Sequence, residues 1–358
     1  MFDIYVSIFE YFSIPRVFII MSWCVVVFCF CAALLIGSVL ALVLWERKLL
    51  GYFTVRLGPN RVGPWGVLQT TADAIKLLFK EDIINSGADR LLFSLAPVIF
   101  FVPVMAVYSL MPFNQWLIGV ESSVGLYLFF AVLSVSVVGI LFAGWSSDNK
   151  YSLLGAVRAV SQVISYEVPL LLSVCGVVLL CGSMNPLVIA ESQSGGVFHW
   201  NIIVGFVSCL IFFVCMLAEL NRCPFDLPEA ESELVSGYNT EYSGMKFALF
   251  FLAEYSLLFI LSCLFVVLFL GGYTSVFGNY VSFWVFSEES FWGQFFVFFE
   301  QIFWMFAKVF FVIFMVIWVR ATFPRMKMNS LIFFCWKFLF PISVVNLLLL
   351  ALFGYFAG

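Results

Sequence analysis

The sequence predicts an all-α integral membrane protein, and three observations carry this interpretation: composition, long uncharged runs and the placement of basic residues. Hydrophobic residues make up 64% of the 358-residue chain and charged residues 11%, whereas soluble domains average about 45–50% and 25%. Several uncharged runs approach the roughly 20 residues that an α-helix needs to cross a bilayer. Lys and Arg gather in alternate loops between these runs, as in multi-pass membrane proteins.

About eight transmembrane helices are expected. Five runs contain no ionisable residue and cover about residues 17–45, 91–111, 124–145, 201–218 and 338–356. Three further runs contain one each, and these are 159–181 with Glu167, 247–270 with Glu254 and 302–319 with Lys308. Lys308 could form a buried pair with Glu300, two turns earlier, or extend from a helix end to the membrane surface. No internal repeat or linker divides the chain, so we expect residues 1–358 to form one polytopic domain.

A further helix, about residues 66–85, is expected to lie in the membrane interface within the first basic loop. It follows the segment LGPNRVGP, whose glycines and prolines interrupt a helix and favour a rigid turn. Apolar residues then share one helical face, while Asp73, Lys76 and Lys80 fall on the other, which is typical of an interfacial helix. A simple membrane anchor and the wall of a cavity that opens toward lipid both fit this pattern.

The basic residues also predict the orientation of the chain. They occur in the loops after the first, third, fifth and seventh helices, and the loops between these contain none. Basic loops face the cytoplasm or the matrix, so both termini should face the opposite side. The N-terminal MFDIYVSIFEYF is unlike a transit peptide or a secretory signal. Together with 46 Phe residues, encoded by AT-rich codons, this favours synthesis inside an organelle, with a bacterium as the alternative.

Motifs for metals and nucleotides are missing from the sequence. The ten cysteines include no CxxC pair, nearly all of them lie in or beside apolar runs, and His199 is the single histidine. No Walker motif or GxGxxG occurs either. We therefore expect the chain itself to hold no metal, nucleotide or flavin.

Carboxylates are the most informative side chains. Glu167 and Glu254 lie within predicted spans, where an unpaired charge costs about 2.5 kcal/mol or more and usually faces a polar cavity. A second group lies in residues 218–255, where few basic residues oppose it. Burial and neighbouring carboxylates raise a carboxyl pKa toward neutral pH, where the group can exchange protons. Proton handling is therefore the leading hypothesis, and a solvated acidic loop is the alternative for residues 229–241.

Four sequence blocks resemble one known family. They are ERKLLGYFTVRLGPNRVGPWGVLQTTADAIKLLFKED from Glu46, GWSSDNKYSLLGAVRAVSQVISYEVP from Gly144, AELNRCPFDLPEAESELVSG with EYSGMKFALFFLAEY from Ala218, and WVRATFPR from Trp318. Together they resemble membrane subunit 1 of NADH:ubiquinone oxidoreductase, respiratory complex I, which is the bacterial H-subunit family. The resemblance spans residue 45 to about residue 341 and agrees with eight helices and outward termini.

The resemblance implies a core subunit that lines the quinone chamber and couples quinone reduction to proton translocation. By motif position, the residues of the chamber or its charged lining are Glu46, Arg47, Arg56, Asp73, Arg222, Asp226, Arg320 and Arg325. The proton-linked carboxylates are Glu167, Glu219, Glu229, Glu231, Glu233 and Glu254. Taken with the composition, which favours synthesis inside an organelle, the resemblance predicts a mitochondrially encoded subunit of the mitochondrial inner membrane, with both termini on the intermembrane-space side.

The expected substrate is ubiquinone, while NAD, FMN and iron–sulfur clusters are expected only on partner subunits. Expected partners are the peripheral quinone-module subunits on the matrix side, neighbouring membrane-arm subunits and lipid, but no nucleic acid. Residues 272–300, with Glu288 and Glu289, are longer than is usual in the family and are expected to contact an additional subunit. Two other functions fit a buried-carboxylate membrane protein: a subunit of a membrane-bound hydrogenase or formate-linked complex, and a proton-coupled transporter.

Overall fold

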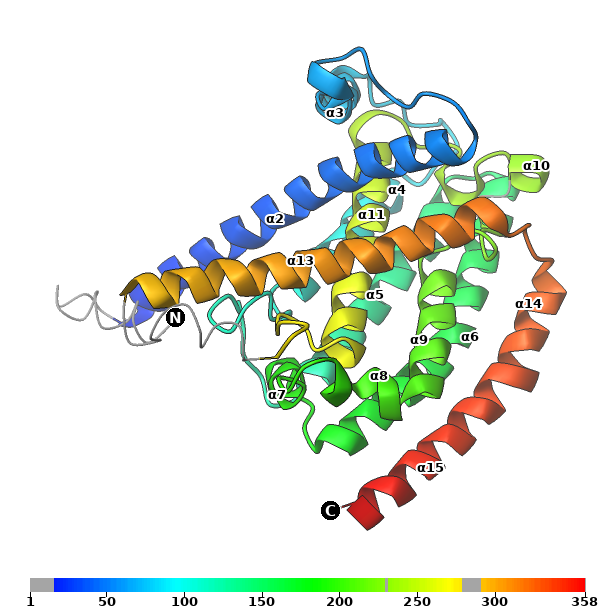
Figure 1. Cartoon of the computed structure of the whole chain (residues 1–358). Coiled ribbons are helices and arrows are strands. Elements are labelled where there is room, and N and C mark those ends of the chain that lie inside the picture. Colours follow the sequence, from blue (N-terminus) through cyan, green and yellow to red (C-terminus); the bar gives the residue numbers. More distant parts are fainter. Residues whose placement is uncertain (1–15, 229–230, 279–290, 358) are drawn as a thin grey trace.

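The computed structural model describes residues 16–228, 231–278 and 291–357, and the regular structure of these residues is entirely helical (Figure 1). Glu229, Glu288 and Glu289 of the sequence predictions lie outside the described residues. The helices are α2 (Arg16–Phe53), α3 (Gln69–Phe79), α4 (Arg90–Tyr108), α5 (Gly125–Ser146), α6 (Lys150–Cys181), α7 (Pro186–Ser192), α8 (Asn201–Val204), α9 (Phe206–Glu219), α10 (Glu231–Leu234), α11 (Gly244–Phe269), α13 (Phe291–Thr322), α14 (Met328–Phe334) and α15 (Phe340–Ala357). Short 3₁₀ turns occupy η1 (Pro64–Gly66), η2 (Val197–His199) and η3 (Gly237–Asn239), and a π-helical turn, η4 (Cys335–Leu339), joins α14 to α15.

The prediction of an all-α membrane protein is confirmed. Among the described residues, seven helices are long and apolar enough to cross a membrane, and α9 is a shorter apolar helix. The predicted span 201–218 is broken at Gly205 into α8 and α9. The 14 residues of α9 extend about 21 Å, less than the roughly 30 Å of a bilayer hydrocarbon core. This helix is therefore too short to cross the hydrocarbon core by itself, and Glu219 is its last residue.

α2 is much longer than the predicted span that ended at residue 45. Its 38 residues extend about 57 Å, and the helix continues through Glu46, Arg47 and Lys48, all good helix formers. α13 is also long, at 32 residues. Both helices run obliquely across the front of the bundle in Figure 1. As a result, the charged end of α2 remains ordered beyond its apolar part.

α11 forms the centre of the bundle. Every residue from Ser256 to Phe269 is buried, and α2, α4 and α13 all pack against this helix. α4 and α5 form another close pair, because Gly139 of α5 has no side chain at the contact: a Cβ there would lie 2.6 Å from the backbone nitrogen of Phe100. Close helix contact at small residues is the usual packing mode in membranes.

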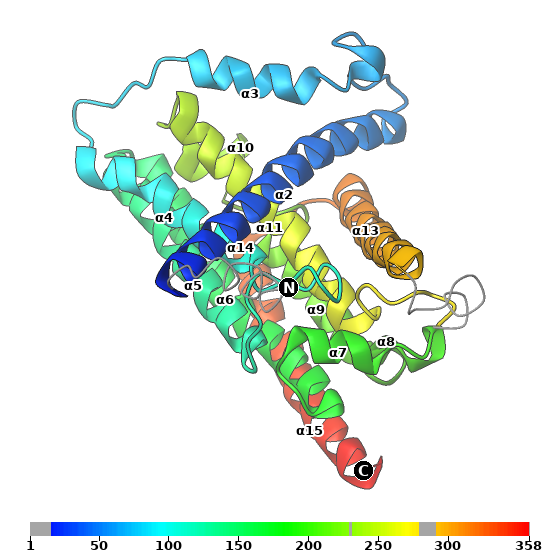
Figure 2. The same cartoon turned by 90° about the vertical axis from the view of Figure 1, so that its left-hand side faces the viewer.

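The interfacial helix is shorter than predicted. It covers Gln69–Phe79, and the chain is extended from Lys80 onward rather than helical to residue 85. α3 lies apart from the main bundle at the top of Figures 1 and 2. The extended segment then contacts the start of α11, where Lys246 pairs with Asp82 at 2.9 Å and Ser243 Oγ accepts a hydrogen bond from the backbone of Ile83.

Loops predicted to lie on the same side of the membrane contact one another. At the end of the bundle that carries α3, Asn149 Nδ2 donates to Glu241 Oε1 at 2.7 Å, which links the loop before α6 to the loop before α11. At the other end, Asn185 Nδ2 lies 3.4 Å from Glu121 Oε1. Which of the two ends faces the cytoplasm or the matrix stays a prediction.

Lys308 follows neither of the two sequence interpretations. It is 7% exposed, so it does not extend to the membrane surface, and its ammonium group bonds backbone oxygens rather than Glu300. Lys308 Nζ donates to Leu270 O at 2.7 Å, Gly272 O at 3.1 Å and Thr274 O at 2.7 Å. These carbonyls follow the C-terminus of α11, where a helix leaves carbonyl groups without intrahelical donors. Lys308 therefore supplies hydrogen-bond donors to the carbonyl groups at the C-terminal end of the central helix. This role depends on the packing of α13 against α11 and could not be predicted from the sequence.

Candidate functional site

A buried carboxylate with two arginines lies where α2, α13 and the turn after α9 meet. Glu46 of α2 is 4% exposed. Arg222 Nη1 donates to Glu46 Oε1 at 2.9 Å, and Arg320 of α13 donates to the same oxygen. The guanidinium of Arg222 also lies 4.7 Å from the ring centre of Tyr255. Two guanidinium groups thus share one buried carboxylate oxygen, and we call Glu46, Arg222 and Arg320 the Glu46 cluster.

A second ion pair joins the turn after α9 to the segment after α13. Arg325 Nη2 lies 3.1 Å from Asp226 Oδ2, and the backbone of Met326 donates to Pro224 O at 3.0 Å. Cys223 Sγ lies 3.3 Å from Phe323 O in the same contact. Burial raises the pKa of the Cys223 thiol, the Asp226 carboxylate raises it further, and Arg325 opposes both effects. The Arg325–Asp226 pair lies beside the Glu46 cluster, and we call the two together the charged layer.

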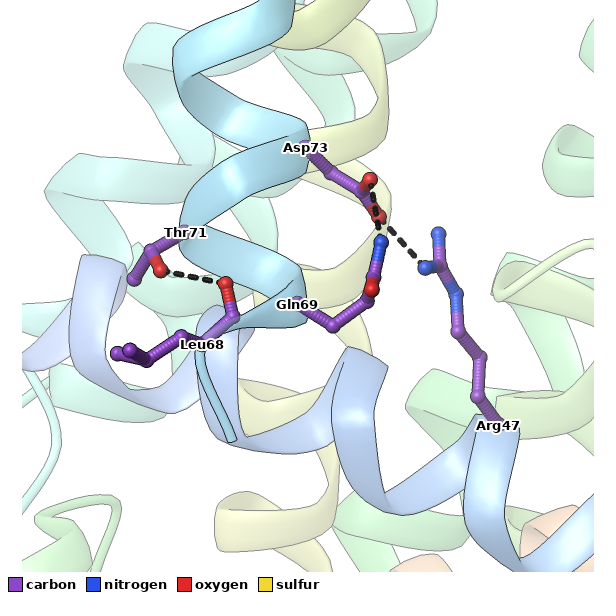
Figure 3. Close-up of polar contacts among 5 residues, drawn as sticks. All are labelled: Arg47, Leu68, Gln69, Thr71 and Asp73. Carbon is purple, nitrogen blue, oxygen red and sulfur yellow. Dashed lines mark hydrogen bonds and ion pairs between the residues drawn. The ribbon is translucent and has the colours of Figure 1, made fainter. Parts of the chain in front are cut away.

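α3 is held to α2 by an exposed polar contact (Figure 3). Arg47 Nη1 donates to Asp73 Oδ2 at 2.6 Å, and Gln69 Nε2 donates to Asp73 Oδ1 at 3.1 Å. Figure 3 shows both side chains directed at the Asp73 carboxylate between the two helices. Arg56, by contrast, is exposed, and its Nε contacts Thr54 Oγ1 at 3.1 Å. The structure therefore does not bring Arg56 to the other predicted chamber residues.

Two of the predicted proton-linked carboxylates share a small cavity. Glu219, the last residue of α9, and Glu254 of α11 both line a space of about 10 Å³ together with Ser136 and Asn221. That volume is about what one water molecule needs. Glu219 Oε2 is buried and has no hydrogen-bond partner in the described part of the chain. Glu254 Oε1 accepts a hydrogen bond from the hydroxyl of Tyr238 in η3.

The remaining carboxylates are placed differently. Glu167 of α6 is half-buried and lies within electrostatic range of Glu219. Glu233 is at the surface, where its Oε2 lies 2.6 Å from Arg158 Nη1 and its side chain is 57% exposed. Glu231 begins the short helix α10. The structure thus gathers Glu167, Glu219 and Glu254, and leaves Glu233 in a solvated ion pair.

Comparison with known proteins identifies the family. The family model described as NADH dehydrogenase matches residues 25–351. The chain belongs to the NADH dehydrogenase family. It is 47% identical over 323 residues to NADH-quinone oxidoreductase subunit 8 of Rhodothermus marinus, covering 90% of this chain and 93% of that protein. It is 46% identical over 327 residues to the H subunit of NADH-quinone oxidoreductase from Bacillus cytotoxicus, covering 90% and 92%, and 43% identical over 329 residues to the same subunit from Brevibacillus brevis, covering 92% of each. The resemblance that the sequence blocks predicted is therefore confirmed.

This family member also has an apolar groove beside the charged layer, between α2, α11 and α13. Its volume is about 450 Å³. Ala33, Gly37 and Ala41 line it from α2, and three phenylalanines line it from the other two helices. A Cβ added at Gly37 would meet no atom within 4 Å, so the small residues of α2 keep the groove open.

Sequence reasoning missed several polar residues of this family site. Tyr238 holds Glu254, Ser136 and Asn221 line the cavity between the carboxylates, and Gln162 of α6 is fully buried beside Asn221. Gln162 could have been found, because a glutamine within an otherwise apolar span is costly and usually functional. Nothing in the local sequence marks Tyr238.

Proposed function

We propose that this chain is the membrane subunit of a proton-translocating NADH:ubiquinone oxidoreductase, respiratory complex I. In this proposal the chain lines the quinone chamber and starts the proton path. NADH oxidation and the redox cofactors, which are FMN and iron–sulfur clusters, belong to partner subunits. The family membership and the names of the bacterial relatives support the enzyme assignment.

One observation carries the link between quinone chemistry and proton transfer. The end of α9 and the turn that follows it contain Glu219, Arg222 and Asp226 within eight residues. Glu219 lines the cavity that it shares with Glu254, whereas Arg222 and Asp226 belong to the ion pairs of the charged layer. A change of charge in the chamber, felt by Arg222 or Asp226, would therefore occur only a few residues along the chain from Glu219, a carboxylate that can exchange a proton.

The electrostatics fit a quinone headgroup. Reduction by two electrons places negative charge on the quinone oxygens until two protons neutralise it. The arginines of the Glu46 cluster would stabilise that charge in a low-dielectric site, as preorganised positive groups do in other enzymes. Arg325 and its partner Asp226 would balance charge beside it. Glu254, Glu219 and Glu167 would supply or relay protons, with the Tyr238 hydroxyl as a donor to Glu254.

The apolar groove fits the isoprenoid tail of the quinone. It lies between three membrane helices, and its lining is aliphatic and aromatic. α3, held to α2 through the Arg47–Asp73 contact, would wall the opening toward lipid rather than serve only as an anchor.

We also propose that the chain is mitochondrially encoded and lies in the mitochondrial inner membrane with both termini toward the intermembrane space. The charged layer would then face the matrix and the peripheral quinone-module subunits. The outer apolar faces of the membrane helices would contact lipid and the neighbouring membrane-arm subunits. Protease treatment of mitoplasts checks this orientation: a tag at the C-terminus should be removed, whereas one inserted before α10 should be protected.

The first experiment is a native gel of mildly solubilised membranes, stained for NADH dehydrogenase activity. Peptides of this chain should appear in the active band, and quinone reduction by that band should be lost to quinone-site inhibitors. A chain that migrates alone would favour a transporter, and one that migrates with a hydrogenase would favour the other alternative. Either result would overturn the proposal.

The second experiment tests the proton path. Glu219→Gln and Glu254→Gln variants of the assembled complex should pump fewer protons per NADH in sealed vesicles. Glu121→Gln is the matched control, because Glu121 is exposed at the other end of the bundle and its loss should leave that ratio unchanged. Unchanged pumping in both cavity variants would refute the assignment of these carboxylates.

A further inference from the structure

Gln162 is the most heavily bonded polar side chain beside the carboxylate cavity. It lies on α6, is fully buried, and directs its Nε2 at the turn after α9. Nε2 lies 2.8 Å from Ala218 O, 3.1 Å from Asn221 Oδ1 and 2.8 Å from Phe225 O. The orientation of the amide follows from these partners, because two of them are backbone carbonyl oxygens and require a donor.

These contacts span the whole turn that joins the two halves of the site. Ala218 precedes Glu219, Asn221 precedes Arg222, and Phe225 precedes Asp226. Asn221 itself has a left-handed backbone with φ of 48°, a conformation that asparagine tolerates better than most residues. One side chain therefore fixes a strained turn at its beginning, middle and end.

The hydrogen bonding of Gln162 is incomplete in a specific way. Its Nε2 has two N–H groups and three acceptor oxygens, so one N–H group must be shared between two acceptors. Its buried Oε1 has no hydrogen-bond partner within the described residues. Incompletely satisfied buried groups are uncommon and call for an explanation beyond fold stability. Such an amide can redistribute its hydrogen bonds among the three acceptors without leaving its place.

Gln193 shows what a purely structural glutamine looks like in the same protein. It is also fully buried, and its Nε2 contacts Ile189 O, Val267 O and Leu268 O. Unlike Gln162, its Oε1 accepts hydrogen bonds, from the backbone of Asn201 and of Gly271, both at 3.1 Å. It lies at the other end of the bundle and touches none of the carboxylates of the site.

We propose that Gln162 is a positioning residue that transmits charge changes in the quinone chamber to Glu219. When the ion pairs of Arg222 or Asp226 respond to quinone reduction, the turn shifts and Gln162 exchanges hydrogen bonds between its ends. Glu219 then changes its position relative to the cavity that it shares with Glu254. This inference rests on the proposed function and adds the element that links its two halves.

The test compares Gln162→Met with Gln193→Met in the assembled complex, since both replace a buried glutamine by an apolar side chain of similar length. Protons pumped per NADH and the pH profile of quinone reduction are measured per amount of complex. Gln162→Met should lower the pumping ratio and shift the pH profile. Gln193→Met should at most reduce the amount of complex. Equal ratios and profiles in the two variants would overturn the inference.

Two further variants keep the test decisive. If Gln162→Met does not assemble, Asn221→Gly replaces it, because glycine keeps the left-handed backbone and removes one acceptor. A lower pumping ratio in Asn221→Gly supports the inference, and an unchanged ratio overturns it. Glu219→Gln distinguishes a failure of this inference from a failure of the proposed proton path. If Glu219→Gln lowers pumping and Gln162→Met does not, only this inference fails. If Glu219→Gln leaves pumping intact, the proposed proton path fails as well.

Discussion

Replacement of Glu46 by Gln should be the most damaging single change in the charged layer. Glu46 is 4% exposed and is the shared partner of Arg222 and Arg320. Breaking a buried ion pair by neutralising one partner costs about 3–5 kcal/mol, because the remaining charge stays buried. Glutamine retains one acceptor and the side chain of Arg320 is 34% exposed, so we expect a loss near the lower end, about 3 kcal/mol.

Two other substitutions set the scale for Glu46→Gln. Arg320→Gln leaves the Glu46–Arg222 pair intact, so it should cost about 1.5–3 kcal/mol, the range of a hydrogen bond to a charged group, and nearer the lower end because the Arg320 side chain is 34% exposed. Arg47→Gln breaks an ion pair whose side chains are 47% and 36% exposed, which should cost about 0–1 kcal/mol. The expected order of damage is therefore Glu46→Gln, then Arg320→Gln, then Arg47→Gln.

The assay is the rate at which the purified complex loses quinone reductase activity at raised temperature. A rate is the appropriate measure, because a multi-subunit complex does not unfold in two states. Native gels run in parallel report whether loss of activity follows loss of assembled complex. If Glu46→Gln inactivates no faster than Arg47→Gln, the buried cluster does not stabilise this end of the bundle and the reasoning is refuted.

Four other changes have expected outcomes. Gly37→Leu should fill the apolar groove and raise KM about tenfold for a long-tailed quinone, with no change for a short-tailed analogue in the same assay. Tyr238→Phe should lower protons pumped per NADH, measured in vesicles, while the amount of complex is retained. Lys308→Met leaves three carbonyls without their donor and should cost about 1–3 kcal/mol, seen as faster thermal inactivation. Burial and the Asp226 carboxylate raise the pKa of the Cys223 thiol, so Cys223 should react slowly with maleimide at neutral pH and faster as pH rises. Arg325 lowers this pKa, so Arg325→Gln should raise it and slow the reaction further.

Composition and hydropathy were sufficient to predict the fold class, because crossing a bilayer requires long apolar helices whatever their packing. The ends of the helices were harder to predict. α2 was expected to end at residue 45, since charged residues follow, yet the helix continues because Glu46 is neutralised by partners 176 and 274 positions away. α3 was expected to reach residue 85, but the chain turns at Lys80 to contact the start of α11. Contacts distant in sequence decided both ends.

The candidate site shows the same division. Motif positions named Glu219 and Glu254, and the structure places both on one cavity. A partner that sets their surroundings carries no such mark: Tyr238, which donates to Glu254, lies in a 3₁₀ turn. Arg56 is a motif position whose side chain is exposed and contacts only its own loop among the hydrogen bonds described, so its place in the chamber stays a prediction.

The distribution of polar groups along α11 bears on where protons leave the proposed path. Glu254 lies near the end of the helix that carries the charged layer, and Lys308 closes the opposite end at Leu270 O. Sixteen residues, about 24 Å of helix, separate these two points. In this stretch Tyr255 packs against Arg222, the hydroxyls of Ser256 and Ser262 donate to carbonyls of their own helix, and the remaining side chains from Leu257 to Phe269 are apolar or cysteine. A proton cannot cross such a segment without polar partners. In the proposed path, a proton taken up at Glu254 would therefore move sideways, through Glu219 and Glu167 toward a neighbouring subunit. We expect removal of that subunit to abolish pumping at this site while these carboxylates remain intact.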